Sequence, residues 1–410
     1  MSNGGSFTAI DIGSHRIKTI IGVFEDKNLK ILGVGVSQSS GVRKGNVLDM
    51  EQFKDDIENS LGEAEKMTGE MASQVYLSVS GTGIDTYVSS GIVAISGNEV
   101  TESDINRALD MAQNGFDFSN KEVLKVIPEE FSCDLESGIK NPVGMLAKKL
   151  EVKAHIFTIG TNIISNIKRG IYDSGVEVAD VYPSILAASE AVLLRRQKEL
   201  GVVCIDIGAS TTGVSVYEEG NLIHATIIPI GGENVTSDGA LGLRVSIDLA
   251  EKLKVEYGNV MFCKEDGIKD EEIDLSKLSK IETGTVSKKY LSEIIRARYT
   301  EILYFVNDEL KKVGKNLMLP EGAVITGGGA KMKGLLDLSR EVLKLPATIG
   351  VPEDSDYIAG TSVADPAFAS VIGTVLLAQK YGVGKGSLKL NFSPGSFLKS
   401  IKNLFSKIVP

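Results

Sequence analysis

The sequence has no tryptophan and only three cysteines and three histidines among its 410 residues. The cysteines, Cys133, Cys204 and Cys263, are far apart and form no CxxC pair, so we expect a reducing compartment and no structural disulfide. The histidines show no spacing typical of a metal site. No stretch reaches about 18 consecutive apolar residues, and the N-terminus lacks the features of a signal peptide. We therefore expect a cytoplasmic protein unless another feature tethers it.

Two common nucleotide motifs and a basic surface are also missing. Neither GxxxxGK[ST] nor a full GxGxxG occurs, which weakens a P-loop or Rossmann interpretation. The net charge of −10 argues against nucleic acid as the main partner, because phosphate neutralisation needs basic side chains. At 410 residues the chain is longer than a single hydrophobic core supports, so two or more domains are expected.

An internal repeat indicates how these domains are built. Residues 8–14 read TAIDIGS, and residues 202–210 read VVCIDIGAS. Each copy continues into a β-rich run, passes a charged turn and enters another β-rich run. A single D-x-G is more often an ordinary turn. Two copies in the same strand–turn–strand frame instead predict two similar α/β domains that face each other across a cleft.

The repeated turns have the composition of a phosphate-binding site. Gly13 and Gly208 let backbone N–H groups approach an anion closely. Asp11 and Asp206 are predicted to hold Mg²⁺ through water, because this ion gives up its hydration reluctantly. Lys18 also has a plainer interpretation as a solvated lysine on an alternating strand. Further predicted contacts with the nucleotide come from Ser14, Lys18, Thr211 and Thr212.

A third glycine-rich element follows much later in the chain. Residues 323–331 read AVITGGGAK, in which Gly327, Gly328 and Gly329 come directly after a β-branched strand. A helical pattern over residues 335–343 follows. Side-chain-free backbone of this kind suits packing against a flat ring, so we predict that this loop contacts adenosine.

These motifs together resemble those of the actin/Hsp70 superfamily. Residues 11–22 are similar to its first phosphate motif, residues 206–216 to the second and residues 324–335 to the adenosine motif. Residues 173–191 and 365–373 resemble its two connecting helices. In that superfamily ATP and Mg²⁺ lie between the paired domains. The resemblance therefore implies an α/β, actin-like fold of two RNase H-like domains around a nucleotide cleft.

A narrower resemblance points to the FtsA family of bacterial cell-division proteins. Residues 228–238, IPIGGENVTSD, resemble that family's turn after the second hairpin. Residues 249–258, LAEKLKVEYG, resemble its next helix, whose Glu and Lys reach the adenosine, and this implies the same role for Glu251 and Lys254. The stretch 126–156 resembles the subdomain that FtsA proteins carry as an insert, which actin and the chaperones lack.

The resemblance also implies the domain boundaries. Residues 1–82, 162–198 and 361–383 are expected to form subdomain 1A, and residues 83–161 the inserted subdomain 1C. Subdomain 2A is expected from residues 199–231 and 306–360, subdomain 2B from residues 232–305, a flexible linker from residues 384–396 and a membrane-targeting amphipathic helix from residues 397–410.

The sequence departs from the hydrolytic members of the superfamily in the first connecting helix. Those members carry Glu or Gln there to orient the attacking water, whereas residues 181–188 are apolar in this chain. Glu190 lies about two turns further along the helix. The second phosphate loop also has Ala209 and Ser210 where a glycine pair is common. We therefore predict slow or negligible ATP hydrolysis and an ATP-binding scaffold in place of an enzyme.

The C-terminal segment has a helical apolar stripe and a basic face. After a Gly-rich polar stretch, its large apolar residues recur at a period of 3.6. A helix docked on the protein's own core is the plain alternative, but the all-lysine face favours an anionic membrane surface, as does the FtsA resemblance. The stripe comprises Phe397, Leu398, Ile401, Leu404, Phe405 and Ile408, and the basic face comprises Lys399, Lys402 and Lys407.

The FtsA resemblance implies partners as well as a cofactor. In that family the helix corresponding to residues 288–307 helps to bind the C-terminal peptide of the tubulin-like protein FtsZ. Arg298 and Glu301 are predicted there, although their i, i+3 spacing also fits an ordinary surface ion pair. The leading hypothesis is a self-associating filament that ties FtsZ to the cytoplasmic face of the membrane at the division site. The inserted subdomain would meet other division proteins.

Two other functions remain open within the same superfamily. A pilus-assembly adaptor shares the inserted subdomain but lacks the terminal lipid helix. A chaperone-like or sugar-kinase ATPase would need a catalytic carboxylate in the cleft beyond the two metal-holding aspartates, and the sequence offers no candidate.

Overall fold

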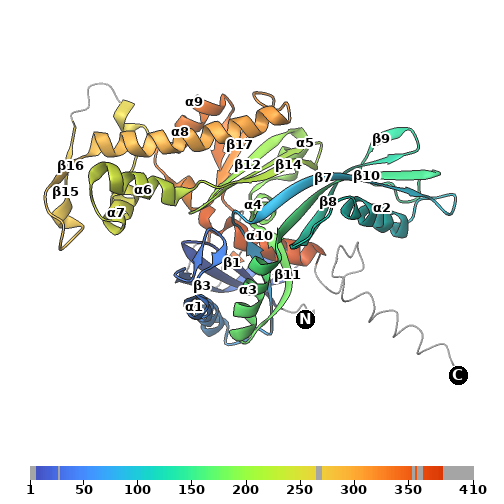
Figure 1. Ribbon diagram of the computed structural model, residues 1–410, viewed down its shortest axis with the longest axis horizontal. Coiled ribbons are helices and arrows are strands. Elements are labelled where there is room, and N and C mark those ends of the chain that lie inside the picture. The colour runs from blue at the N-terminus through green and yellow to red at the C-terminus, as the bar shows by residue number, and fades with distance from the viewer. Residues whose placement is uncertain (1–5, 26–27, 265–269, 353–355, 358–362, 382–410) are drawn as a thin grey trace.

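Two large sheets of the same topology form the centre of the molecule (Figure 1). The computed structural model describes residues 6–25, 28–264, 270–352, 356–357 and 363–381. The first sheet has the order β11 (Glu177–Pro183), β6 (Gln74–Val79), β1 (Phe7–Ile12), β2 (Arg16–Glu25), β3 (Asn28–Gln38) and β19 (Asp356–Tyr357). The second has the order β18 (Ala347–Ile349), β17 (Ala323–Thr326), β12 (Val202–Ile207), β13 (Thr212–Glu218) and β14 (Asn221–Ile228).

Five strands of the first sheet match the five strands of the second, and β19 has no counterpart. In each, three antiparallel strands, β1-β2-β3 or β12-β13-β14, continue into two parallel ones. Asp11 pairs with Lys18 on one side and Ser78 on the other, while Asp206 pairs with Gly213 and Thr326. The repeat in the sequence is therefore a structural repeat, and the prediction of two similar α/β domains is confirmed.

Two helices cross between the sheets. α4 (Ser184–Val192) packs against β12 and β13, and α10 (Ala369–Tyr381) packs against β1 and β2. At their crossing a Cβ on Gly373 would lie 1.7 Å from the carbonyl oxygen of Ala187, so only glycine permits this approach. These helices overlap the stretches that resemble the connecting helices of the superfamily, residues 173–191 and 365–373, and they link the two sheets.

The outer face of the first sheet is covered by α1 (Met50–Thr68). Asp49 caps its start by accepting from the Gln52 N–H, and Gly69 ends it with a φ of 74°. Phe53, Ile57 and Leu61 recur every four residues, so one stripe of the helix is buried. α3 (Thr161–Asp173) packs beside α1.

A separate antiparallel sheet is inserted between β6 and β11 (Figure 1). Its order is β7 (Ile84–Ala94), β10 (Lys149–Gly160), β8 (Lys121–Cys133) and β9 (Glu136–Ile139). α2 (Glu102–Asn114) covers one face, and its first turn is closed by a capping box between Thr101 and Asp104. A Cβ on Gly91 would lie 1.9 Å from the carbonyl oxygen of Ala108, so this helix lies very close to β7. The expected insertion is present.

Helices are added to the second sheet. α6 (Gly232–Leu243) and α7 (Ile247–Tyr257) follow β14, and α8 (Lys288–Lys312) runs beside them (Figure 1). α9 (Leu335–Leu343) packs on α8. The remaining elements are α5 (Arg195–Leu200), β4 (Val42–Arg43), β5 (Asn46–Val47), β15 (Glu272–Asp274), β16 (Thr285–Ser287), η1 (Phe262–Lys264), η2 (Leu275–Lys277), η3 (Gly328–Lys331) and η4 (Pro366–Phe368).

The predicted linker and amphipathic helix, residues 384–396 and 397–410, lie outside the described residues. Among the residues that the structure does describe, no helix is long and apolar enough to cross a bilayer.

Candidate functional site

Asp11 lies at the end of the central strand of the first sheet. Its side chain is 11% exposed, and its Oδ2 lies 3.1 Å from Lys18 Nζ. The Ser78 hydroxyl donates to Oδ1 at 2.8 Å. Lys18 is only 13% exposed, so it is not a solvated strand lysine. Its positive charge is held next to the carboxylate instead.

Asp206 occupies the matching place in the second sheet. Burial, together with the nearby Asp11 carboxylate, raises the pKa of Asp206 to about 6, and Lys18 offsets part of this rise. Ser370 Oγ, on α10 of the other domain, donates to its Oδ2 at 3.4 Å. The two carboxylates therefore carry more negative charge than Lys18 neutralises. Carboxylate oxygens with this excess charge are the ligands that a hard cation such as Mg²⁺ prefers.

The turns that follow the two aspartates are tight. A Cβ on Gly13 would lie 2.6 Å from the carbonyl oxygen of Arg16. In the second turn the Gly208 N–H donates to Thr211 O at 2.9 Å, and the Gly232 N–H donates to Gly208 O at 2.9 Å. Ser14 is half-buried in the first turn. Both turns are therefore closely packed, and the contact of their backbone with phosphate stays a prediction.

The two threonines of the second turn have different environments. The Thr211 hydroxyl lies 2.9 Å from that of Ser80, which follows β6 in the first domain. The Thr212 side chain is fully buried, and its hydroxyl donates to Ile230 O at 2.8 Å. Thr211 is thus at the boundary between the domains, whereas the Thr212 hydroxyl closes the turn internally.

The three glycines after β17 serve different purposes. Gly327 has a φ of 83°, and a Cβ there would lie 2.3 Å from Asp206 Oδ1. A Cβ on Gly329 would lie 2.4 Å from Ile207 Cγ2. At Gly328 no atom of the described residues lies within 4 Å of the ideal Cβ position. Close packing explains why glycine is needed at Gly327 and Gly329. Gly328 instead adjoins open space.

Glu251 and Lys254 form one polar cluster on α7 with Thr236 of α6. Lys254 Nζ lies 2.6 Å from Glu251 Oε2 and 2.8 Å from Thr236 Oγ1. Burial raises the pKa of Glu251, but the ammonium group of Lys254 holds this pKa below its usual range. Burial lowers the pKa of His15, and Glu251 and Lys254 are among the charges that act on it.

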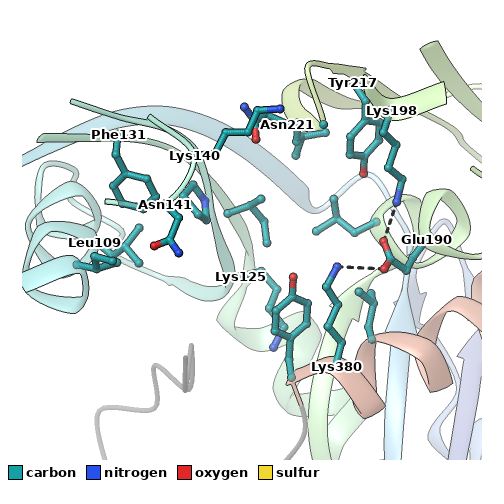
Figure 2. A pocket seen from close by; sticks show the side chains of 18 of the residues that line it. Leu109, Lys125, Phe131, Lys140, Asn141, Glu190, Lys198, Tyr217, Asn221 and Lys380 are labelled. Carbon is teal, nitrogen blue, oxygen red and sulfur yellow. Dashed lines mark hydrogen bonds and ion pairs between the residues drawn. The ribbon is translucent and has the colours of Figure 1, made fainter. Parts of the chain in front are cut away.

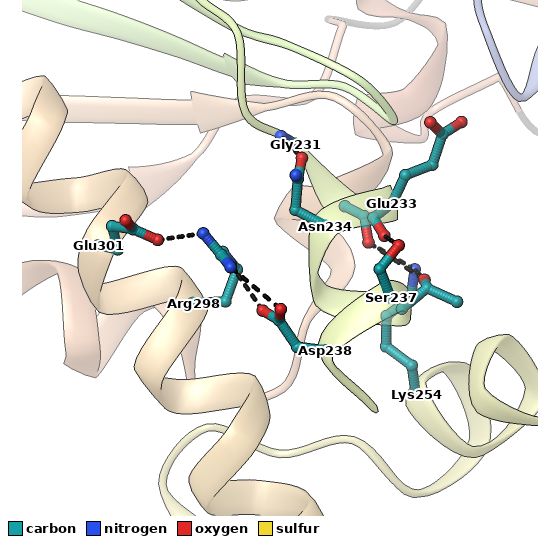
Figure 3. Close-up of polar contacts among 10 residues, drawn as sticks. Gly231, Glu233, Asn234, Ser237, Asp238, Lys254, Arg298 and Glu301 are labelled. Atoms are coloured by element: carbon teal, nitrogen blue, oxygen red, sulfur yellow. Dashed lines mark hydrogen bonds and ion pairs between the residues drawn. The ribbon is translucent and has the colours of Figure 1, made fainter. Parts of the chain in front are cut away.

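Arg298 joins α8 to α6 (Figure 3). Its Nε lies 2.6 Å from Asp238 Oδ2 and its Nη2 lies 3.0 Å from Asp238 Oδ1, so the contact is bidentate. The guanidinium also contacts Glu301. The predicted i, i+3 pair is present, and Asp238 is the partner that the spacing did not reveal.

Glu190 is directed away from the aspartate pair. Its carboxylate accepts from Lys198 at 2.7 Å and from Lys380 at 3.1 Å. Burial raises the pKa of Glu190, but these two ammonium groups hold it below its usual range. This glutamate is therefore engaged in a cavity outside the cleft.

Sequence reasoning missed three hydroxyl groups at this site: those of Ser80, Thr236 and Ser370. Ser80 could have been found, because it ends a strand adjacent to β1, and the ends of neighbouring parallel strands meet at one edge. Ser370 and Thr236 reach the site from helices, which no spacing in the sequence signals.

Comparison with known proteins agrees with this geometry. The family described as "Cell division protein FtsA" matches residues 203–373, and the "SHS2 domain inserted in FTSA" matches residues 81–158. The FtsA protein of Pseudomonas aeruginosa is 32% identical, over 96% of this chain and 93% of its own length. The chain belongs to the FtsA family. Two further FtsA proteins support this assignment. The FtsA protein of Bacillus subtilis is 32% identical, over 92% of this chain and 84% of its own length. The FtsA protein of Escherichia coli K12 is 31% identical, over 97% of both chains.

Solved structures show the actin-like fold of this FtsA family member. The PilM-PilN type IV pilus biogenesis complex superimposes with a TM-score of 0.68 at 14% identity, over 92% of this chain and 99% of that chain. MreB5 of Spiroplasma citri bound to ADP superimposes with a TM-score of 0.53 at 14% identity, over 92% and 96%. At such identities the likeness concerns the fold. The fold is that of an actin-like ATPase family, with the FtsA-type insertion in place.

Proposed function

We propose that this chain binds ATP with Mg²⁺ in the cleft between its two sheets. The observation that carries the proposal is the pairing of Asp11 and Asp206 at matching positions, close enough that one charge raises the pKa of the other. A bound Mg²⁺ would offset part of the negative charge of the two carboxylates and of the phosphates beside them. MreB5, which shares the fold, has been solved with ADP bound.

Most of the predicted contacts fit this proposal, whereas the Thr212 hydroxyl is bonded within its own turn. Backbone N–H groups of the two turns that contain Gly13 and Gly208 would hold phosphate oxygens, with Ser14, Thr211 and Lys18 beside them. The Gly208 N–H itself is engaged with Thr211 O, so it would not be one of these donors. The open backbone at Gly328 would pack against the base, since no side chain or main chain of the described residues fills that space. Glu251 and Lys254 would contact the nucleoside from α7.

We further propose that ATP serves mainly as a structural ligand and is hydrolysed slowly. The first connecting helix offers only buried apolar or small residues at its start, among them Ile185, Leu186 and Ala187. Glu190 is held by two lysines outside the cleft. A carboxylate so engaged is not free to orient a water for attack.

In the cell, we propose that ATP-bound copies polymerise and tie FtsZ to the cytoplasmic face of the membrane at the division site. Membership of a cell division family supports this, as does the amphipathic pattern of residues 397–408. Arg298 and Glu301 lie on α8 near exposed apolar side chains, Leu241 on α6 and Tyr304 on α8. Such a mixed surface fits a short peptide, here the FtsZ C-terminus.

Co-sedimentation with vesicles containing phosphatidylglycerol tests the proposal. With ATP and Mg²⁺ the chain should pellet with vesicles and bring FtsZ with it, and Asp206→Asn should lose the ATP dependence. Phe405→Glu should abolish pelleting, whereas Ser406→Glu adds the same charge to the polar face and should preserve it better. If the amount that pellets with vesicles changes neither with ATP nor in the Phe405→Glu variant, the proposed anchor is disproved.

A further inference from the structure

A cavity of about 500 Å³ lies where three units meet, away from the nucleotide cleft (Figure 2). Its walls come from α2 and β8 of the inserted sheet, from β11, α4 and α10 of the first domain, and from the β13–β14 hairpin of the second. The volume falls in the range of ligand-binding pockets, roughly 300–1,000 Å³. Much of the lining is apolar, including Ile105, Leu109, Phe131, Val143 and Leu377.

Three of the lysines that line the cavity have acidic partners. Lys125 Nζ lies 2.6 Å from Asp180 Oδ2 and 4.2 Å from the ring centre of Tyr182. The Glu190 carboxylate accepts from both Lys198 and Lys380 (Figure 2). Because these lysines already have acidic partners, they do not call for an anionic ligand. The remaining surface suits apolar side chains.

The described chain ends at the mouth of this cavity. α10 finishes with Leu377, Lys380 and Tyr381, all of which line it. Residues 382–396 follow, and at full extension they could span up to about 50 Å. They lead to the apolar stripe of residues 397–408. That stripe is therefore tethered within reach of the cavity at a high effective concentration.

Charge favours the same contact. Residues 382–410 contain five lysines and no acidic residue, so they carry +5, whereas the whole chain carries −10. The net charge of residues 1–381 is therefore −15. A helix that inserted its apolar stripe would direct its lysines outward, and the net charge of residues 1–381 is opposite in sign to theirs.

We propose that residues 397–408 dock their apolar stripe in this cavity when no lipid is present. The same side chains cannot enter lipid while they are docked, so the cavity would hold back membrane attachment. The effect on membrane attachment rests on the proposed membrane function, whereas docking itself does not. Docked molecules would lower the apparent lipid affinity in proportion to their population.

Photo-crosslinking of the full-length chain tests docking directly. Benzoylphenylalanine in place of Phe405 should crosslink within the same chain to peptides of α2, β8 or α10. Vesicles of phosphatidylglycerol should remove these crosslinks. Crosslinks confined to other surfaces, or formed only between two chains, would overturn the proposal, as would none at all.

A matched pair of rim variants gives the second readout. Val143 is 45% exposed and lines the cavity, whereas Leu146 is 74% exposed on the same loop and does not. Val143→Asp should reduce crosslinking and tighten vesicle binding severalfold, and Leu146→Asp should change neither. Equal behaviour of the two would overturn docking. If the chain crosslinks but never binds vesicles, docking stands and the membrane function fails.

Discussion

The hydroxyl groups of Ser80 and Thr211 lie 2.9 Å apart, one at the end of β6 in the first domain and one before β13 in the second. This contact joins the two halves of the cleft beside the predicted phosphate site. Thr211 therefore has two candidate roles, a bridge between domains and a contact for the nucleotide. The two roles predict different results for substitutions at the two positions.

Ser80→Ala and Thr211→Ala should each lower stability by about 0.5–1.5 kcal/mol, because each removes the same hydrogen bond. Only Thr211→Ala should also weaken ATP binding, since its hydroxyl is the one predicted to contact phosphate. Scanning calorimetry and titration with ATP would measure the two effects. Thr211→Ser keeps the hydroxyl and serves as control. If Ser80→Ala weakens ATP binding as strongly, Thr211 acts only through domain closure.

The sequence was informative about this cleft wherever a motif is local. Asp11, Asp206 and Gly327 each occur beside a strand in a short, repeated or glycine-rich stretch, and the structure brings them together. The three consecutive strands that begin each large sheet also followed, because each copy of the repeat reads strand, turn, strand, charged turn, strand. Motif, strand and turn are all set by residues within about ten positions of each other.

Contacts between distant segments were not predictable in this way. Ser370 reaches Asp206 across 164 residues, and Asp238 reaches Arg298 across 60. Neither pair has a spacing that a helix or strand period would select. Thr212 shows that a local motif can also mislead. Its position in the second turn predicted a contact with the nucleotide, whereas its hydroxyl donates to Ile230 O within the turn.

Asp206 should make stability depend on pH in the absence of nucleotide. Its pKa is about 6 in the folded chain against a usual value of 3.8, so the folded state binds more protons between these values. The free energy of unfolding therefore falls as pH rises from about 4 to about 6, and the loss persists above. Complete loss would amount to about 3 kcal/mol, and partial exposure reduces it.

Asp206→Asn should remove this penalty. Without nucleotide at pH 7.5, the variant should melt several degrees above the parent, and the difference should shrink at pH 4.5. It should also lose Mg²⁺-dependent ATP binding, because a neutral amide is a poor substitute for a carboxylate. Calorimetry at both pH values checks the first effect. If Asp206→Asn is no more stable than the parent at pH 7.5, the carboxylate is neutralised in another way.

Gly328 and Gly329 should separate ligand contact from packing. Gly328→Ala adds a methyl group to open space, so stability should change by no more than about 0.5 kcal/mol. ATP affinity should fall at least about tenfold, if that space receives the base. Gly329→Ala would meet Ile207 Cγ2 and should cost about 1–3 kcal/mol of stability. Unchanged ATP affinity in Gly328→Ala would place the base elsewhere.

Arg298 offers a test of the FtsZ surface with a neighbour as its control. Arg298 bonds Asp238 and Glu301 at a partly exposed position, so Arg298→Ala should cost no more than about 1 kcal/mol of stability. Arg296, two residues earlier, instead contacts Glu341 and Val260 O on another face of α8. Arg296→Ala should therefore lower the melting temperature without affecting a peptide on the Arg298 face.

Binding of the FtsZ C-terminal peptide, measured by fluorescence anisotropy, should weaken about tenfold or more in Arg298→Ala. Arg298→Lys should not restore it, because an ammonium cannot hold Asp238 in two bonds and position Glu301 as well. Equal loss in the Arg296 and Arg298 variants would indicate a general disturbance of α8. Full affinity in the double variant Arg298→Ala, Glu301→Ala would exclude this surface as the peptide site, since no charge of the predicted pair would then remain.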